Sequence, residues 1–141
     1  MMRYLALDIG DERIGLAISD ATGLLARPLT VIARRPGPGS FRQIAALVAE
    51  HGVEAIVVGL PLLPSGQEGK QAASARAYVK GLVEYVALPI YWQDERDTTR
   101  EAEAIMAETG RSARRRRRLQ DAVAAAVILQ AFLNERREKP L

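Results

Sequence analysis

The order of the apolar runs constrains the fold of this chain more than any other feature. Two apolar segments, 2–9 and 13–19, are separated only by Gly10-Asp11-Glu12, a connection that predicts a β-hairpin. Three further strands are predicted, at residues 28–33, 55–58 and 89–93. The last two alternate with segments of helical spacing. Three antiparallel strands followed by parallel strand–helix units predict an α/β fold with a mixed five-stranded sheet flanked by helices.

The helical segments complete this expected order. Ser40 is a plausible N-cap for a helix through residue 51, and a second helix is predicted from residue 71 to residue 86. Thr98 and Glu101 form a capping box for a helix that reaches residue 108, and the last helix is expected from about Leu119 to Glu135. With 141 residues, 48% of them hydrophobic, and no repeat or linker, residues 1–141 are predicted to form one domain.

The composition excludes several classes of protein. The chain has no Cys, which excludes disulfides and thiolate zinc sites, and its single His51 lacks a second nitrogen ligand for zinc. No segment approaches the roughly 18 apolar residues that span a bilayer, and charges at the N-terminus argue against a signal peptide. We therefore expect a soluble cytoplasmic protein that does not associate with membranes.

Three carboxylates lie at the edges of apolar elements. Asp8 interrupts the apolar first strand, Glu95 ends the run 90–95, and Asp121 opens the Ala- and Val-rich last helix. A buried carboxylate is costly unless it is paired or binds a metal. Simpler roles exist, because Asp8 could cap a turn with Gly10 and Asp121 could be a first-turn acid that the helix dipole favours. Convergence on one cation explains their apolar settings better.

Asp94 competes with Glu95 for the same role. Adjacent residues on a strand point to opposite faces of the sheet, so only one of the two can enter the site. We predict that Glu95 enters it, with Asp94 as the alternative.

This arrangement of acids suits phosphodiester hydrolysis. Mg²⁺ and Mn²⁺ prefer oxygen ligands, and two such ions can activate a water and neutralise charge on the phosphate. We expect Asp8 to bridge the ions from the centre of the sheet, Glu95 to bind one ion, and Asp121 to complete the site from the last helix. The predicted cofactor is Mg²⁺ or Mn²⁺.

Arginine is concentrated in one segment. Six of the chain's 20 Lys and Arg residues fall in residues 109–120, and the 14 that remain are fewer than the 17 acids. A solvated loop is one interpretation, but blocks of like charge are typical of contacts with a polyanion. We predict that this segment binds nucleic acid through Arg111, Arg114, Arg115, Arg116, Arg117 and Arg118.

Four ordered segments resemble the motifs of the YqgF/RuvX family of Holliday-junction-resolvase-like nucleases. They are residues 5–20, residues 56–62 with Gly66 and Glu68-Gly69 beyond them, residues 94–102, and residues 121–130. The resemblance implies a ribonuclease H-like fold and a divalent-metal site. It also implies one of two roles: cutting branched DNA, or trimming the 5′ end of the small-subunit ribosomal RNA precursor. The arginine run before the fourth motif is denser than the family pattern.

Two other functions remain open on the sequence. Asp8-Ile9-Gly10 also fits the phosphate loop of an actin-like ATPase or sugar kinase, although 141 residues leave no room for the second lobe of that fold. A catalytically silent nucleic-acid-binding protein would keep the same fold and arginines. The sequence does not decide between DNA and RNA, since both polymers carry the same phosphate. Symmetric junction cleavage would require a homodimer.

Overall fold

A mixed five-stranded sheet forms the middle layer of the structure, a computed structural model that describes residues 2–95 and 113–138, the last without the side chains of 113–119 and 138. The strands are β1 (Tyr4–Ile9), β2 (Arg13–Ser19), β3 (Ala26–Ala33), β4 (Ala55–Leu60) and β5 (Ile90–Asp94). They lie in the order β3-β2-β1-β4-β5. β1, β2 and β3 are antiparallel neighbours, whereas β4 is parallel to β1 and β5 is parallel to β4. This confirms the predicted mixed sheet and its hairpin, which Gly10 closes with a 2.9 Å hydrogen bond to the Arg13 carbonyl.

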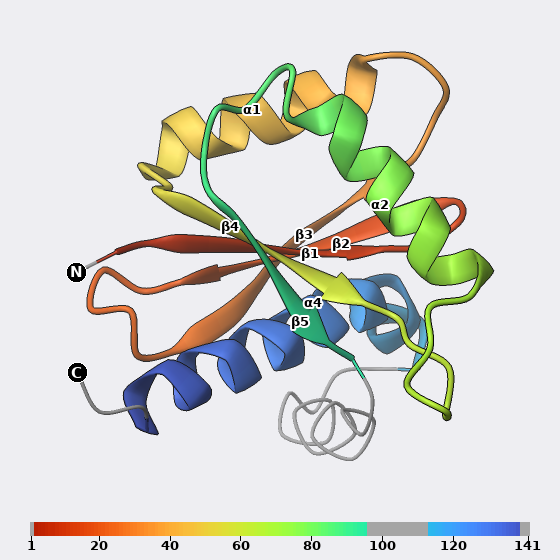
Figure 1. Ribbon diagram of the computed structural model, residues 1–141. Helices are drawn as coiled ribbons and strands as arrows, with labels where there is room; N and C mark the ends of the chain where they lie inside the picture. The colour runs from red at the N-terminus through yellow and green to blue at the C-terminus, as the bar shows by residue number, and fades with distance from the viewer. Residues whose placement is uncertain (1, 96–112, 139–141) are drawn as a thin grey trace.

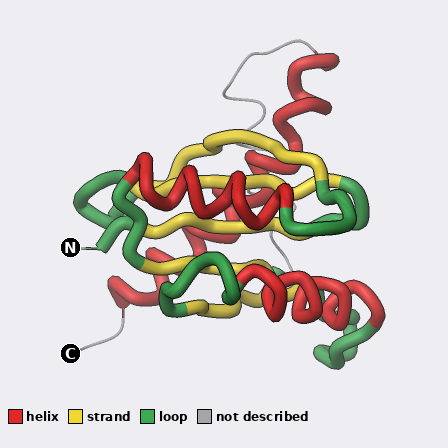
Figure 2. The backbone as a smooth tube through the Cα atoms, turned by 90° about the horizontal axis from the view of Figure 1, so that it is seen from above, coloured by secondary structure: helices red, strands yellow, loops and turns green. Residues whose placement is uncertain are grey.

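Helices cover both faces of the sheet. Figure 1 shows α1 (Gly39–His51) and α2 (Lys70–Leu82) over one face and α4 (Ala113–Glu138) under the other. In the perpendicular view, α1 and α2 lie side by side in front of the strands and α4 passes behind them (Figure 2). Within the ranges described, no helix is long and apolar enough to cross a membrane.

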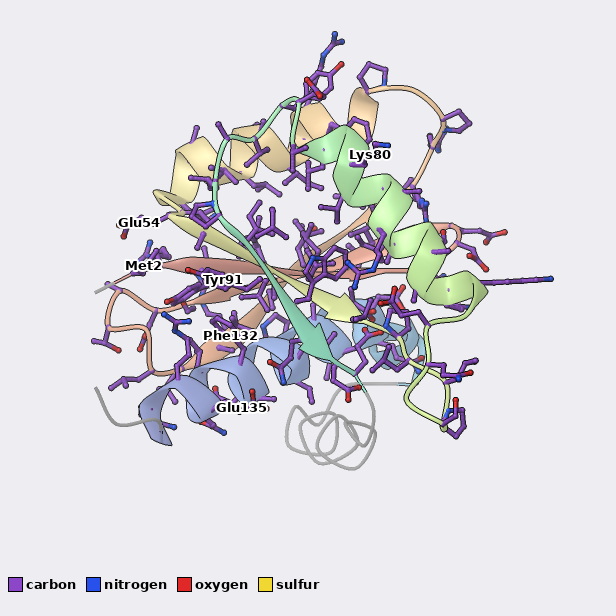
Figure 3. The ribbon with its side chains drawn as sticks, viewed as in Figure 1. Met2, Glu54, Lys80, Tyr91, Phe132 and Glu135 are labelled. Carbon is purple, nitrogen blue, oxygen red and sulfur yellow. The ribbon has the colours of Figure 1, made fainter. Side chains whose placement is uncertain are left out.

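The alternation of side chains along β1 divides the interior into two cores. Leu5, Leu7 and Ile9 belong to the core under α1 and α2, whereas Tyr4 and Ala6 belong to the core against α4. In the second core, the Phe132 ring of α4 packs on Tyr4 and Tyr91, with centroids 5.3 Å and 5.4 Å apart (Figure 3). Asp8 falls in the same alternation as Tyr4 and Ala6, so its side chain lies on the α4 face.

Two predicted helix boundaries were wrong. α4 begins at Ala113 rather than at Leu119, so the backbone of the arginine run is helical. Arg is a good helix former, and this propensity outweighs the repulsion between neighbouring guanidinium groups. α2 ends at Leu82 rather than at residue 86, because the chain turns there, with a hydrogen bond from Glu84 N–H to the Gly81 carbonyl. The helix predicted at 98–108 lies outside the described residues.

Ser40 does not cap α1. The N-cap position is Pro38, without a side-chain hydrogen bond, and Ser40 lies inside the first turn. Its buried hydroxyl hydrogen-bonds instead to the Tyr78 hydroxyl of α2, 2.6 Å away. The chain enters the helix two residues earlier than predicted, and Ser40 joins the two helices on that face of the sheet.

Candidate active site

Asp8 lies between two strand glycines on the face that α4 covers. It pairs with Gly15 of β2, and Gly59 of β4 lies one residue beyond the Leu7–Val58 pair of β1 and β4. A Cβ at Gly15 would overlap the backbone carbonyl of Asp121. One at Gly59 would lie 2.5 Å from Oε1 of Glu95. Because glycine has no side chain, these two positions leave room for the other two predicted acids beside Asp8.

Glu95 reaches Asp8 from the end of the neighbouring strand. Its backbone N–H donates to the Leu60 carbonyl at 3.2 Å, which continues the parallel pairing of β4 and β5. Its carboxyl group is hydrogen-bonded to that of Asp8. Two carboxyl groups can share a hydrogen bond only when one of them carries a proton. The structure thus brings Glu95 to Asp8, as predicted.

Burial raises the pKa of both acids, and the hydrogen bond between them decides which one is protonated. Burial, the hydrogen bond to Asp8 and the charges of Asp8 and Asp94 together raise the pKa of Glu95 to about 9. The pKa of Asp8 is also raised, first by burial and also by the charge of Asp121, while the hydrogen bond from Glu95 lowers it. Protonated Glu95 therefore donates to the Asp8 carboxylate at neutral pH. Asp94 acts here as a neighbouring charge on Glu95.

Asp121 lies inside α4, and not at its first turn as expected from the sequence. The helix starts eight positions earlier, at Ala113, and has no acid in its first turn. The dipole of the helix N-terminus therefore does not explain this residue. Its carboxylate forms an ion pair with Arg13, with Nε and Oδ2 2.9 Å apart. Asp121 and Arg13 line a hollow of about 310 Å³ together with the hairpin residues Gly10, Asp11 and Glu12.

The three predicted acids are thus neighbours, but they do not yet form a complete metal cage. Among residues 2–95 and 113–138, no three Asp, Glu or His side chains are arranged to hold a metal ion. The donor set nevertheless fits a divalent ion such as Mg²⁺ or Mn²⁺. Asp8 and Glu95 present carboxylate oxygens at a buried point where a proton now separates two acids, and a cation can take the place of that proton. Asp121 offers a third carboxylate nearby, which is paired with Arg13.

The predicted arginine contacts are only partly described. Arg114, Arg115, Arg116, Arg117 and Arg118 belong to the first turns of α4, ahead of Asp121 on the same helix, and Arg111 lies outside the described residues. The run is therefore joined to the acidic site by continuous helix.

Sequence reasoning missed three residues that shape this site. Gly15 and Gly59 could have been found, because a glycine inside a strand often marks a place where another backbone or side chain approaches closely. Arg13 gave no such indication, since a charged residue at the first position of a strand is ordinary.

Comparison with known proteins shows two kinds of similarity. Residues 2–135 match the model of the RuvX family, described as Holliday junction resolvase. Proteins from Anaeromyxobacter sp. (strain Fw109-5) and Roseiflexus sp. (strain RS-1), each named "Putative pre-16S rRNA nuclease", are 47% and 42% identical over 135 residues. These alignments cover 96% of this chain and 98% and 96% of those relatives.

Two solved resolvases share the fold. Thermus thermophilus RuvC in complex with a Holliday junction substrate superposes with a TM-score of 0.61 at 20% identity, covering 100% of both chains. The fowlpox virus resolvase bound to junction DNA gives 0.59 at 12% identity, covering 95% of this chain and 98% of that one. At these identities the similarity shows the fold alone, which is the ribonuclease H-like fold predicted from the sequence.

Proposed function

The chain belongs to the RuvX family, and on that premise we propose that it is a divalent-metal-dependent endonuclease acting on structured nucleic acid. The observation that carries the proposal is the hydrogen-bonded pair of Asp8 and Glu95, with Asp121 beside it on α4. Burying two acids that share a proton lowers the stability of the fold, and a cation-binding role accounts for their presence.

Each acid has a defined part in this proposal. Asp8, Glu95 and Asp121 would hold Mg²⁺ or Mn²⁺, and Glu95 would have to lose its proton to serve as a ligand. Bound ions of this kind activate a water and offset the charge that develops on the phosphate and the leaving oxygen. Gly15 and Gly59 keep the three carboxylates close, and the arginines at the start of α4 bind the nucleic-acid backbone next to the site.

Of the two substrates, we propose the small-subunit ribosomal RNA precursor as the first, trimmed at its 5′ end. The relatives that share more than two fifths of their residues with this chain are named for that RNA. The description of the family model favours a second candidate, the Holliday junction. Cutting both strands of a junction symmetrically needs two active sites, so in that role the protein would act as a homodimer. Both substrates place the protein in the cytoplasm.

A cleavage assay tests this proposal. Purified protein is incubated with a precursor-like RNA carrying a 5′ extension, a mobile four-way DNA junction and a linear duplex, each with Mg²⁺, Mn²⁺ or a chelator. We expect internal cleavage of the RNA with either ion and none with the chelator or with Asp8→Asn. Cleavage of the junction but not of the RNA would indicate that the substrate is branched DNA.

The same assay, extended by a sample with ATP, separates the alternatives. Binding of RNA or DNA without cleavage under any ion would indicate the catalytically silent nucleic-acid-binding protein. Release of phosphate from ATP without cleavage of any polymer would indicate the ATPase.

A further inference from the structure

Arg13 is paired with Asp121, the third carboxylate that a metal ion bound to Asp8 and Glu95 would use. Its Nε lies 2.9 Å from Oδ2 of Asp121, so the guanidinium holds an oxygen that a cation bound to Asp8 and Glu95 would also need. Among the residues that line this hollow, three are acids, Asp11, Glu12 and Asp121, and Arg13 alone is basic.

The ion pair relieves a repulsion that would otherwise act inside the site. The charge of Asp121 opposes the ionised form of Asp8, because the two carboxylates are close enough to interact. A guanidinium on Asp121 offsets that charge while no metal is present. A divalent cation would offset it more strongly and would repel the guanidinium, so the two cations compete for the same oxygen.

The position of Arg13 allows this exchange. Its backbone is fixed at the start of β2, where its carbonyl accepts the hairpin hydrogen bond from Gly10 and it pairs with Ala33 of β3. Its side chain, in contrast, is 64% exposed, whereas that of Asp121 is 28% exposed. The guanidinium can therefore leave Asp121 for solvent without any repacking of the core.

We infer that Arg13 is a positioning residue that holds Asp121 in the metal-free site, yields it to an incoming divalent cation, and then binds a backbone phosphate of the substrate. This inference rests on the proposed nuclease function for its last step. Its first step, the exchange of Arg13 for a cation on Asp121, concerns metal binding alone. Arg suits both steps, because its planar fork binds carboxylate and phosphate alike.

Titration of the metal-free protein with Mn²⁺ by calorimetry at low salt tests the exchange. Arg13→Gln is expected to bind Mn²⁺ about three- to tenfold more tightly than the wild type, because Asp121 is no longer occupied. Arg13→Lys keeps the charge and should restore an affinity close to that of the wild type. Arg27→Gln is the matched control, since Arg27 is exposed on β3 at the opposite end of β2, where it pairs with Ile18. It should leave the affinity unchanged.

Thermal melting separates this role from a purely structural one. If the ion pair only ties β2 to α4, Arg13→Gln will lower the Tm equally with chelator and with Mn²⁺, and the Mn²⁺ affinity will not rise. If Arg13 is exchanged for the cation, the loss of Tm will be confined to the chelator sample. Equal or weaker Mn²⁺ binding by Arg13→Gln, or no Mn²⁺ binding by the wild type, would overturn the inference.

Cleavage kinetics test the last step. With saturating Mn²⁺ and the RNA or junction that the wild type cuts, Arg13→Gln should raise KM about tenfold while kcat changes less. An unchanged KM would remove Arg13 from phosphate binding. If the wild type cuts neither polymer, the proposed function fails, whereas tighter Mn²⁺ binding by Arg13→Gln would still support the exchange.

Discussion

Asp8 is hydrogen-bonded to Glu95, and burial and the charge of Asp121 raise its pKa. Asp8 therefore interacts with both of the other acids in the site. Asp8→Asn keeps the shape of the side chain but removes its charge. We expect it to lower metal-dependent cleavage at least about a thousandfold, or about 4 kcal/mol of transition-state stabilisation, without loss of the fold. Circular dichroism and a single-turnover assay measure the two effects.

Asp94→Asn is the matched control for Glu95→Gln. Both changes replace a carboxylate by an amide at neighbouring positions, and Glu95 is the predicted ligand, with its carboxyl group hydrogen-bonded to Asp8. We expect Glu95→Gln to resemble Asp8→Asn in the cleavage assay and Asp94→Asn to lose less than about tenfold, or 1.4 kcal/mol. The opposite ranking would make Asp94 the ligand.

The proton on Glu95 gives the metal-free protein a pH dependence of known sign. The pKa of Glu95 in the fold is about 9, above its ordinary value of 4.5, so between these values the folded state binds more proton than the unfolded chain. This contribution to the free energy of unfolding is complete below about pH 4.5 and declines as the pH rises towards 9.

Melting in chelator at several pH values measures this decline. The Tm of the wild type should fall from pH 5 to about pH 9, and that of Glu95→Gln, which has no such proton to lose, should fall less. Parallel curves for the two proteins would show that Glu95 is not the titrating group.

At the scale of the elements, the packing of α4 on the sheet depends on Gly15. Its Cβ would overlap the Asp121 backbone, which cannot move without the rest of the helix. Gly15→Ala should therefore lower the free energy of unfolding by about 3 kcal/mol in denaturant titrations. Gly39→Ala is the control: nothing lies within 4 Å of that Cβ, and Ala at the start of α1 should stabilise by about 0.5 kcal/mol. Equal effects would contradict the close approach of α4.

The two ends of α4 allow a matched test of nucleic-acid binding. Arg117 and Arg118 lie ahead of Asp121, whereas Arg136 and Arg137 lie in the last turn. Replacing the first pair with Gln should weaken RNA binding at every sequence and reduce the salt slope by about 1.4 to 1.8. The same replacement at the second pair should change the slope little. Equal salt slopes for the wild type and the first variant would indicate that the arginine run is a solvated segment of helix that does not bind RNA.

At the scale of the whole molecule, two hydrophobic cores on opposite faces of the sheet hold the fold together without metal. A chelator should therefore leave the protein folded. A divalent ion at 100 times its Kd should add about 2.7 kcal/mol to the free energy of unfolding, and the gain should shrink in Asp8→Asn. Chemical denaturation with and without the ion measures this difference. Unfolding by the chelator would instead indicate a structural metal.

The sequence predicted the sheet well because each strand carries its own pattern. The runs around Leu7, Ile18 and Val57 are apolar and are bounded by turn residues, so the strands follow from local information. Their directions follow from the connections, a short hairpin or a helix, whereas the order of the strands within the sheet was not predicted. The start of α4 was missed because charge repulsion was weighed above the helix propensity of arginine. The Arg13–Asp121 ion pair joins residues that are distant in sequence, so no local sequence pattern predicts it.

The order of the elements along the chain has a consequence for synthesis. Asp8 is made with the first strand, Glu95 follows the fifth, and Asp121 belongs to α4, the last element described. A nascent chain that has released all five strands but not α4 therefore lacks its third acid and one side of its second core. Under the proposed function, the growing polypeptide stays inert towards the RNA of the ribosome that is making it, and activity begins only once α4 has docked.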